Sequence, residues 1–126
     1  MLAQLEMDAP PEWNGSFVPL LDVLLHLRSR FAAGLGMELV IGDVTVFNFR
    51  KFEQGMAFYT ECCGVGPGDE YRAFREWMTK SEWEPTSAGW MPTLLEKCNG
   101  DHRAAIRKYL DLAAELAEAR RAGRAT

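Results

Sequence analysis

The sequence predicts an α+β domain in which one helix comes first, a small antiparallel sheet of two or three strands follows, and three helices complete the fold. Three observations support this prediction. Apolar side chains recur at helical spacing from Phe17 to Phe31. Runs rich in β-branched and aromatic residues follow between residues 37 and 49. Helical spacing then returns in the second half of the chain, from Tyr71 to Leu116.

The size and composition are those of one globular domain. The chain has 126 residues, of which 48% are hydrophobic and 25% are charged. Residues 1–15 are predicted to form a loose leader, because Pro10-Pro11 disfavours a helix, and Trp13 is expected to hold this leader against the domain. The single domain is predicted to span residues 16–118, and residues 119–126 are expected to fray.

The first helix has recognisable signals at both ends. Ser16 is a suitable N-cap, and Pro19 falls in the first turn, where its missing N–H group does no harm. Gly34 and Gly36 are expected to end the helix, because glycine readily adopts the conformation that follows a helix.

Three strands are predicted next. The first two span residues 37–41 and 44–49, and Gly42-Asp43 between them fits either a two-residue hairpin turn or a bulge in one longer strand. The third spans residues 56–63, after a turn predicted at Glu53-Gln54-Gly55. A sheet this small is not stable alone, so helices are expected to cover at least one of its faces.

Three helices are predicted in the second half. The first carries Phe74, Trp77 and Met78 and precedes a loop at residues 81–90. The second begins at Pro92 and ends at about Cys98, where Asn99-Gly100 stops it. Asp101 is a good N-cap for the last helix. The apolar face of that helix combines eight side chains: Ala105, Ile106, Tyr109, Leu110, Leu112, Ala113, Leu116 and Ala117.

The charge balance narrows the class of partner. The formal net charge is −4 and the isoelectric point is near 5.2. A nucleic-acid binder needs an excess of Lys and Arg to displace the counterions of phosphate, so direct binding to nucleic acid is disfavoured. An acidic chain is better suited to a basic protein partner, because complementary potentials speed and select encounters.

The cysteines and the N-terminus favour a cytoplasmic protein. Cys62, Cys63 and Cys98 form no secretory disulfide framework, so reduced thiols are expected, and Cys62 and Cys63 are interpreted as core thiols. The N-terminus lacks the basic region and apolar run of a signal peptide. No stretch is long and apolar enough for a membrane helix, so no membrane partner is expected.

Candidate catalytic residues are sparse. Asp22 and His26 lie four residues apart on one helix face and are interpreted as an exposed ion pair, although such a pair also resembles half of a catalytic triad. His102 is interpreted as a surface residue. Two histidines and three cysteines form no metal-ligand spacing. The segment from Gly64 to Asp69 lacks the third glycine of a dinucleotide loop, so neither a metal nor a cofactor is expected.

A cluster of tryptophans and glutamates is the strongest binding signal. Three tryptophans fall between residues 77 and 90, and glutamates lie among them. Tryptophan is favoured at binding hot spots, and acidic neighbours would attract a basic partner. Packing into the core is the favoured interpretation of Trp77 and Trp90, whereas Trp83 is the best candidate for an exposed indole. The candidate partner-binding residues are Trp83, Glu82, Glu84, Trp90 and Glu76.

Several short motifs in the same part of the chain carry a resemblance. They are Phe74-Arg75-Glu76-Trp77, Gly89-Trp90, Leu94-Leu95-Glu96, Asn99-Gly100-Asp101 and the run from Ala105 to Leu112. With them, the segment from Tyr71 to Leu116 resembles small bacterial immunity proteins of polymorphic-toxin and contact-dependent inhibition systems. The resemblance implies a cytoplasmic protein without enzymatic activity, which binds one cognate toxin, commonly a nuclease, and occludes its active site.

These observations favour a non-catalytic protein-binding module that neutralises a basic bacterial toxin. Two other functions stay open. One is a homodimeric structural or regulatory subunit. The other is a small enzyme that uses Asp22 and His26, or a cysteine, in an unrecognised pocket.

Overall fold

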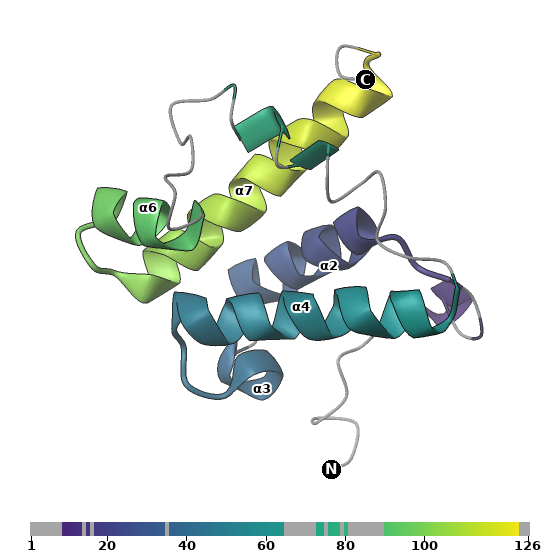
Figure 1. The fold of residues 1–126 in the computed structure, drawn as a ribbon, viewed down its shortest axis with the longest axis horizontal. Helices are drawn as coiled ribbons and strands as arrows, with labels where there is room; N and C mark the ends of the chain where they lie inside the picture. The colour runs from purple at the N-terminus through teal and green to yellow at the C-terminus, as the bar shows by residue number, and fades with distance from the viewer. Residues whose placement is uncertain are drawn as a thin grey trace.

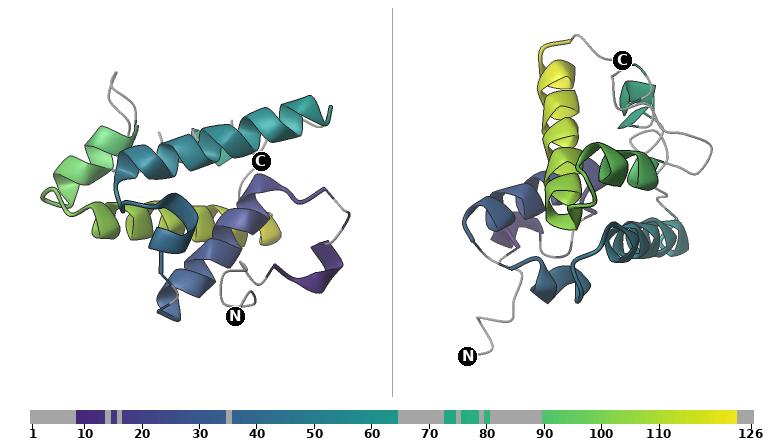
Figure 2. Two further views of the ribbon diagram at one scale, coloured as in Figure 1. Left: turned by 90° about the horizontal axis from the view of Figure 1, so that it is seen from below. Right: turned by 90° about the vertical axis from the view of Figure 1, so that its left-hand side faces the viewer.

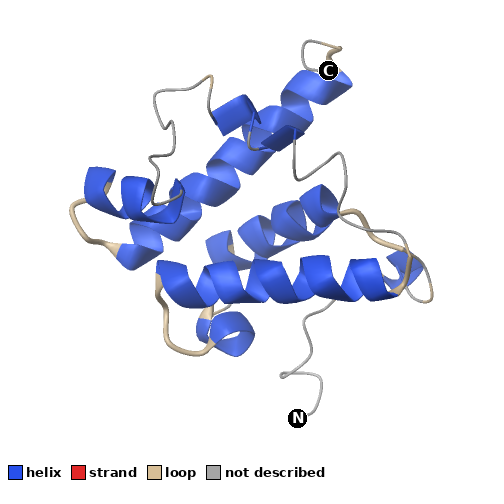
Figure 3. Cartoon of the chain, viewed as in Figure 1, coloured by secondary structure: helices blue, strands red, loops and turns tan. Residues whose placement is uncertain are grey.

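The described part of the chain is built from helices alone. A computed structural model describes residues 9–13, 15, 17–34, 36–64, 73–74, 76–78, 80 and 90–123. Within these ranges there are six helical elements and no strand (Figures 1 and 3), so the predicted α+β class is wrong. The elements are η1 (Pro11–Trp13), α2 (Leu20–Ala32), α3 (Glu38–Ile41), α4 (Val46–Cys62), α6 (Trp90–Lys97) and α7 (His102–Arg121).

Helix α7 is the centre of the arrangement. It contacts α2, α6 and α4, while α3 packs against α4 (Figure 2). One face of α7 is buried along almost its whole length, and all but one of its eight predicted apolar residues are fully buried, with Ala117 partly buried. The other helices supply the rest of a single core. Its largest fully buried apolar side chains are Phe49, Leu24, Met37, Met78, Leu94, Ile106, Leu110, Leu116 and Val46.

The three predicted strands are helical instead. Residues 38–41 form α3. Residues 46–49 of the second predicted strand and residues 56–62 of the third lie within α4. Helix α4 begins with a strong local signal, because the Thr45 side chain accepts a hydrogen bond from the Asn48 N–H at 3.0 Å. The turn expected at Glu53-Gln54-Gly55 lies in the middle of this helix.

The helical period of α4 is visible once its burial is known. Val46, Phe49 and Glu53 are buried, and Phe52 and Met56 are half-buried, so the inward side follows spacings of three and four residues. A glutamate in this stripe interrupts the apolar pattern, and β-branched and aromatic residues before it imitate a strand. Because of these two features, the sequence from Val44 to Phe49 shows the two-residue period of a strand although it lies mostly in a helix.

The turn at Gly42-Asp43 is real, but it joins two helices rather than two strands. Gly42 has a φ of 71°, which favours glycine. The Asn48 side chain donates hydrogen bonds to the carbonyl oxygens of Ile41 and Asp43, at 3.2 and 2.8 Å, and so fixes the loop between α3 and α4.

The remaining helix predictions are confirmed in outline. Helix α2 ends at Ala32, before Gly34, although it begins at Leu20 and the expected cap Ser16 lies outside the described residues. Helix α6 begins at Trp90, two residues before the expected start at Pro92.

Helix α7 has the predicted signals at its start. Asn99 and Gly100, with φ values of 58° and 80°, separate it from α6. The Asp101 side chain accepts a hydrogen bond from the Ala104 N–H at 3.1 Å, as expected of an N-cap. The helix continues to Arg121, and Ala119 is buried.

The predicted helix around Phe74 is described only in part. Residues 73–74 and 76–78 are helical, and Phe74 and Met78 are buried in the core. The loop was predicted at residues 81–90, and its last residue, Trp90, belongs to α6 instead. Residues 81–89, the glycine-rich segment after Gly64 and the first eight residues of the leader lie outside the described residues.

Candidate functional site

The solvent-facing side of α4 carries large apolar side chains that are more than half exposed. One of them, Phe47, meets the ring of His102 edge-on at 6.2 Å, at the start of the helix. We call Phe47, Lys51, Gly55, Phe58, Tyr59 and Cys62 the outer face of α4. Phe47, Phe58 and Tyr59 are 54%, 68% and 70% exposed. The left view of Figure 2 shows α4 along one edge of the molecule over its full length. A group of exposed aromatic side chains on one helix is typical of an interaction surface.

A groove continues the outer face on one side. It has a volume of about 900 Å³ and lies between α4 and the segment that leads into α2. Among the described residues that line it, Lys51 is the one charged side chain. Lys51, Gly55 and Tyr59 belong both to the groove and to the outer face. The rest of the lining is Gly15, Phe17, Val18, Phe52, Met56, Thr60 and Cys63.

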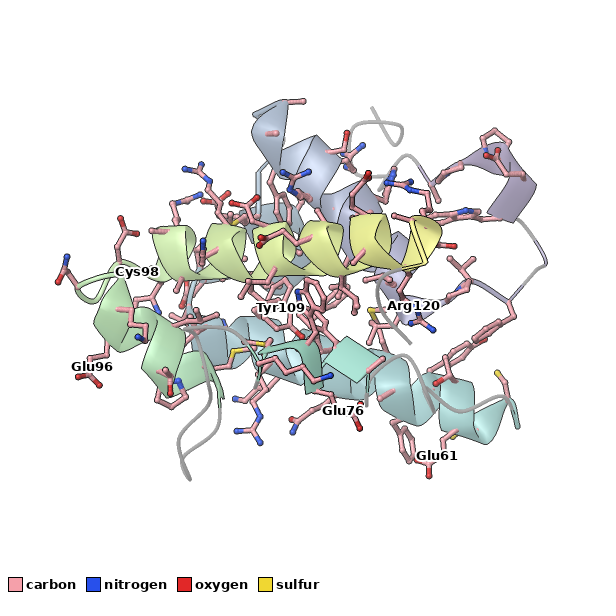
Figure 4. The ribbon with its side chains drawn as sticks, turned by 90° about the horizontal axis from the view of Figure 1, so that it is seen from above. Glu61, Glu76, Glu96, Cys98, Tyr109 and Arg120 are labelled. Atoms are coloured by element: carbon pink, nitrogen blue, oxygen red, sulfur yellow. The ribbon has the colours of Figure 1, made fainter. Side chains whose placement is uncertain are left out.

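The charges beside the outer face have opposite signs at its two ends. Arg50 and Lys51 are exposed in the first half of α4, and Glu61 is exposed in its last turn. Figure 4 shows Glu61 near the end of the helix. The outer face therefore has an apolar centre with a basic end and an acidic end.

A buried carboxyl group lies on the opposite side of the same helix. Glu53 is fully buried, and the Tyr109 hydroxyl of α7 donates a hydrogen bond to its Oε2 atom. Its Oε1 atom is buried without a hydrogen-bond partner. Burial raises the pKa of Glu53 to about 8, against the smaller lowering effects of the Tyr109 hydrogen bond and the Arg50 charge.

The surroundings of Glu53 indicate a structural role. Tyr109 stacks on Phe74, with ring centroids 4.8 Å apart, and meets Phe49 edge-on at 5.6 Å. Figure 4 shows Tyr109 between α7 and α4. The sequence pattern does not predict Glu53 as a buried residue, because Glu53-Gln54-Gly55 is typical of a turn. Its position seven residues after Val46 and four after Phe49 was the signal that could have placed it in the core.

Each histidine contacts another element. The Nδ1 atom of His102 accepts a hydrogen bond from the Val46 N–H at 3.1 Å, so this side chain binds the first turn of α4. The interpretation of His102 as a surface residue is therefore wrong. The ring of His26 packs edge-on against Trp13 at 5.3 Å, and this contact holds the described part of the leader to α2 as predicted. Asp22, the expected partner of His26, is exposed.

The cysteines differ from expectation in burial. Cys62 and Cys63 are exposed free thiols at the end of α4, so their interpretation as core thiols is wrong, and Cys98 is a partly buried free thiol. Within the described ranges, no group of three or more His, Cys, Asp or Glu side chains is placed to hold a metal ion.

The predicted cluster of tryptophans and glutamates is described only in part. Glu76 is exposed and points away from α7 (Figure 4), and Trp77 is half-buried against the core. Trp90 is the first residue of α6. Glu82, Trp83 and Glu84 lie outside the described residues, so the structure does not bring the cluster together.

Comparison with known proteins adds no relative. No family model, no curated protein and no solved structure matches the chain. No helix in the described ranges combines the length and apolar character needed to cross a membrane.

Proposed function

We propose that this protein is a non-catalytic protein-binding module and that its partner docks on the outer face of α4. The observation that carries the proposal is the exposure of Phe58 and Tyr59, which are 68% and 70% exposed on consecutive positions of a well-anchored helix. Aromatic side chains of this size supply much of the affinity at protein interfaces when they become buried. The groove beside Phe52 and Met56 gives a partner's apolar side chain a place to insert.

The partner we propose is a cognate bacterial toxin met in the cytoplasm, as the resemblance of residues 71–116 to immunity proteins implies. An immunity protein acts by covering its toxin, and it needs a preformed surface rather than catalytic groups. Glu76, one of the predicted partner-binding residues, is exposed, and Glu61 is exposed on α4 itself. Negative charge at these two positions favours encounter with a basic toxin.

Co-expression with the product of the neighbouring reading frame tests this function. We expect that product to slow growth when expressed alone, and this chain to relieve the effect and co-purify with the product. Replacing Phe58 and Tyr59 together by serine should weaken the complex by at least about tenfold, because both aromatic anchors are lost.

The matched control is Leu39→Ser, which removes a large exposed apolar side chain, 49% exposed, from α3 instead of α4. The control should bind like the wild type, and circular dichroism should show that all variants remain helical. A neighbouring product that is neither toxic nor bound would contradict the proposal. Equal loss of binding in the control would contradict the assignment to α4.

A further inference from the structure

We propose that, in the absence of another partner, the outer face of α4 binds α4 of a second copy of this chain, antiparallel, about a two-fold axis that passes between Gly55 and Phe58. The inference rests on the proposed function in one respect, namely that the outer face is a docking surface. It adds that this surface is complementary to itself, which a surface built for a foreign partner alone has no reason to be.

The spacing along the helix is the first observation. Lys51, Gly55, Phe58 and Cys62 follow one another at intervals of four, three and four residues, and all four are exposed. Side chains at these intervals form one stripe with the 3.5-residue period of a coiled-coil seam. The intervals read the same in both directions, so the stripe superimposes on itself when the helix is reversed.

Reversing the helix brings complementary shapes together. Gly55 then lies opposite Phe58 of the second copy, and Phe58 lies opposite the second copy's Gly55. A Cβ atom at Gly55 would meet no atom within 4 Å, so the glycine leaves an open notch in the outer face. The ring of Phe58, 68% exposed, can pack over the position where Gly55 carries no side chain. The two-fold axis creates this contact twice.

The charges agree with the same orientation. The antiparallel seam places Lys51 beside Glu61 of the second copy, one residue from the position directly opposite, and does so at both ends. A parallel pair would instead place Lys51 beside Lys51 and Glu61 beside Glu61. Like charges directly opposite destabilise helix pairs, whereas unlike charges set their orientation. Charge complementarity thus selects the antiparallel pair.

The exposed charges of the face have opposite signs at its two ends. Arg50 and Lys51 precede Phe58 on α4, and Glu61 follows it. A second copy therefore meets unlike charges at both ends, whereas a basic toxin that docks here needs an acidic group of its own opposite Lys51. The seam from Lys51 to Cys62 is only about 18 Å long, so the expected dimer is weak and exchanges readily with free monomer.

Analytical ultracentrifugation of the full chain over a dilution series tests the proposal. We expect a reversible monomer–dimer equilibrium. Lys51→Glu and Glu61→Lys should each weaken the dimer by roughly tenfold at low salt, because each turns two attractive pairs into repulsive ones. The double variant K51E/E61K restores both ion pairs with the signs reversed. The dissociation constant of its dimer should therefore lie within about threefold of the wild-type value, a change no larger than one exposed ion pair produces.

Two further variants probe the centre of the seam. Phe58→Ser removes the knob, and Gly55→Gln fills the notch with a residue that favours helix more than glycine does. Both should be monomeric while remaining helical. Glu115→Lys, an exposed charge reversal on α7, is the control and should dimerise like the wild type.

The outcomes separate this inference from the proposed function. A wild-type chain that stays monomeric at its highest soluble concentration overturns the dimer, as does a double variant no better than the single ones. If the neighbouring gene product still co-purifies through Phe58 and Tyr59 in that case, the docking function stands without the dimer. Rescue by the double variant with no bound gene product supports the dimer and contradicts the toxin partner.

Discussion

The carboxyl group of Glu53 is held away from water where α4 meets α7. Its one hydrogen bond comes from Tyr109, and the aromatic rings of Phe49 and Phe74 flank that tyrosine. A charged carboxylate in such surroundings is costly, so the folded chain keeps the proton that the unfolded chain releases. The folded state therefore depends on pH through a group that solvent does not reach.

The expected result is a loss of stability as pH rises. The pKa of Glu53 is about 8 in the folded chain, against an ordinary value of 4.5. Below 4.5 both states hold the proton, and between the two values only the folded state does. The free energy of unfolding should therefore fall across this window, by up to about 1.4 kcal/mol per pH unit, and level off above it.

Urea unfolding at a series of pH values measures this effect, with Glu53→Gln as the comparison. The amide of the variant does not titrate, so the slope contributed by Glu53 should disappear while the other ionisable groups stay as they are. Parallel pH profiles for the wild type and the variant would show that Glu53 does not hold its proton on folding.

His102 gives a second prediction at the level of one residue. Its Nδ1 atom accepts the Val46 N–H, one of the helix-terminal donors that has no partner within α4. His102→Leu should lower the free energy of unfolding by about 1 kcal/mol, the usual cost of losing a cap. His102→Asn keeps an acceptor at the equivalent position and should lose clearly less. Equal losses in chemical denaturation would place the effect in packing rather than in the hydrogen bond.

At the scale of one element, α4 shows what the sequence could and could not predict. Its start is encoded locally in Thr45 and Asn48, and those residues were read as part of a strand because Val44, Val46 and Phe47 favour extended backbone. Tertiary contacts decide whether this segment forms a helix or a strand. Phe49 and Glu53 reach α7 only as a helix, and nothing local announces a buried glutamate.

The helices with conventional end signals could be predicted from the sequence, because these signals are local and do not depend on tertiary contacts. Gly34 after α2 and the pair Asn99-Gly100 after α6 stop a helix whatever packs against it, and Asp101 caps α7 by a contact within four residues. The candidate site was not predictable. The sequence pointed to Trp83 and its glutamates, whereas the exposure of Phe58 and Tyr59 depends on which side of α4 faces the core.

Substitution by alanine should have opposite effects on the free energy of unfolding at Gly55 and at Gly100. Gly55 lies inside α4 with open space around it, so Gly55→Ala should raise the free energy of unfolding by about 0.5–1 kcal/mol through helix propensity. Gly100 has equally open surroundings but a φ of 80°. Gly100→Ala should therefore lower stability by about 1 kcal/mol. Thermal unfolding of both variants checks the signs, and a common sign would contradict the assigned backbone conformations.

On the scale of the whole molecule, the buried apolar side chains stabilise the fold, whereas the exposed ones contribute little to stability. Leu24 is fully buried in the core, on the helix that packs against α7. Leu24→Ala should cost about 2–5 kcal/mol, the usual range for a buried leucine. Leu39→Ala, at a position 49% exposed, should change stability by less than about 1 kcal/mol. Guanidinium denaturation of the two variants measures the contrast, and similar losses would contradict the placement of the core.

The net charge divides unevenly as well. Residues 1–64 contain 4 basic and 8 acidic side chains, residues 65–89 contain 3 and 5, and residues 90–126 contain 7 and 5, so the acidity lies in the first two ranges. Composition alone predicted an acidic partner surface, but it could not say that α4 exposes Arg50 and Lys51 as well as Glu61.

The central place of α7 has a consequence for synthesis on the ribosome. Helices α2, α4 and α6 each contact α7, which comes last among the described helices. A nascent chain therefore emerges with its apolar surfaces, Phe49 and Leu24 among them, before the helix that covers them has been made. Until α7 leaves the exit tunnel, the earlier helices are a target for chaperones and proteases. At that stage the outer face of α4 is one of several exposed apolar surfaces.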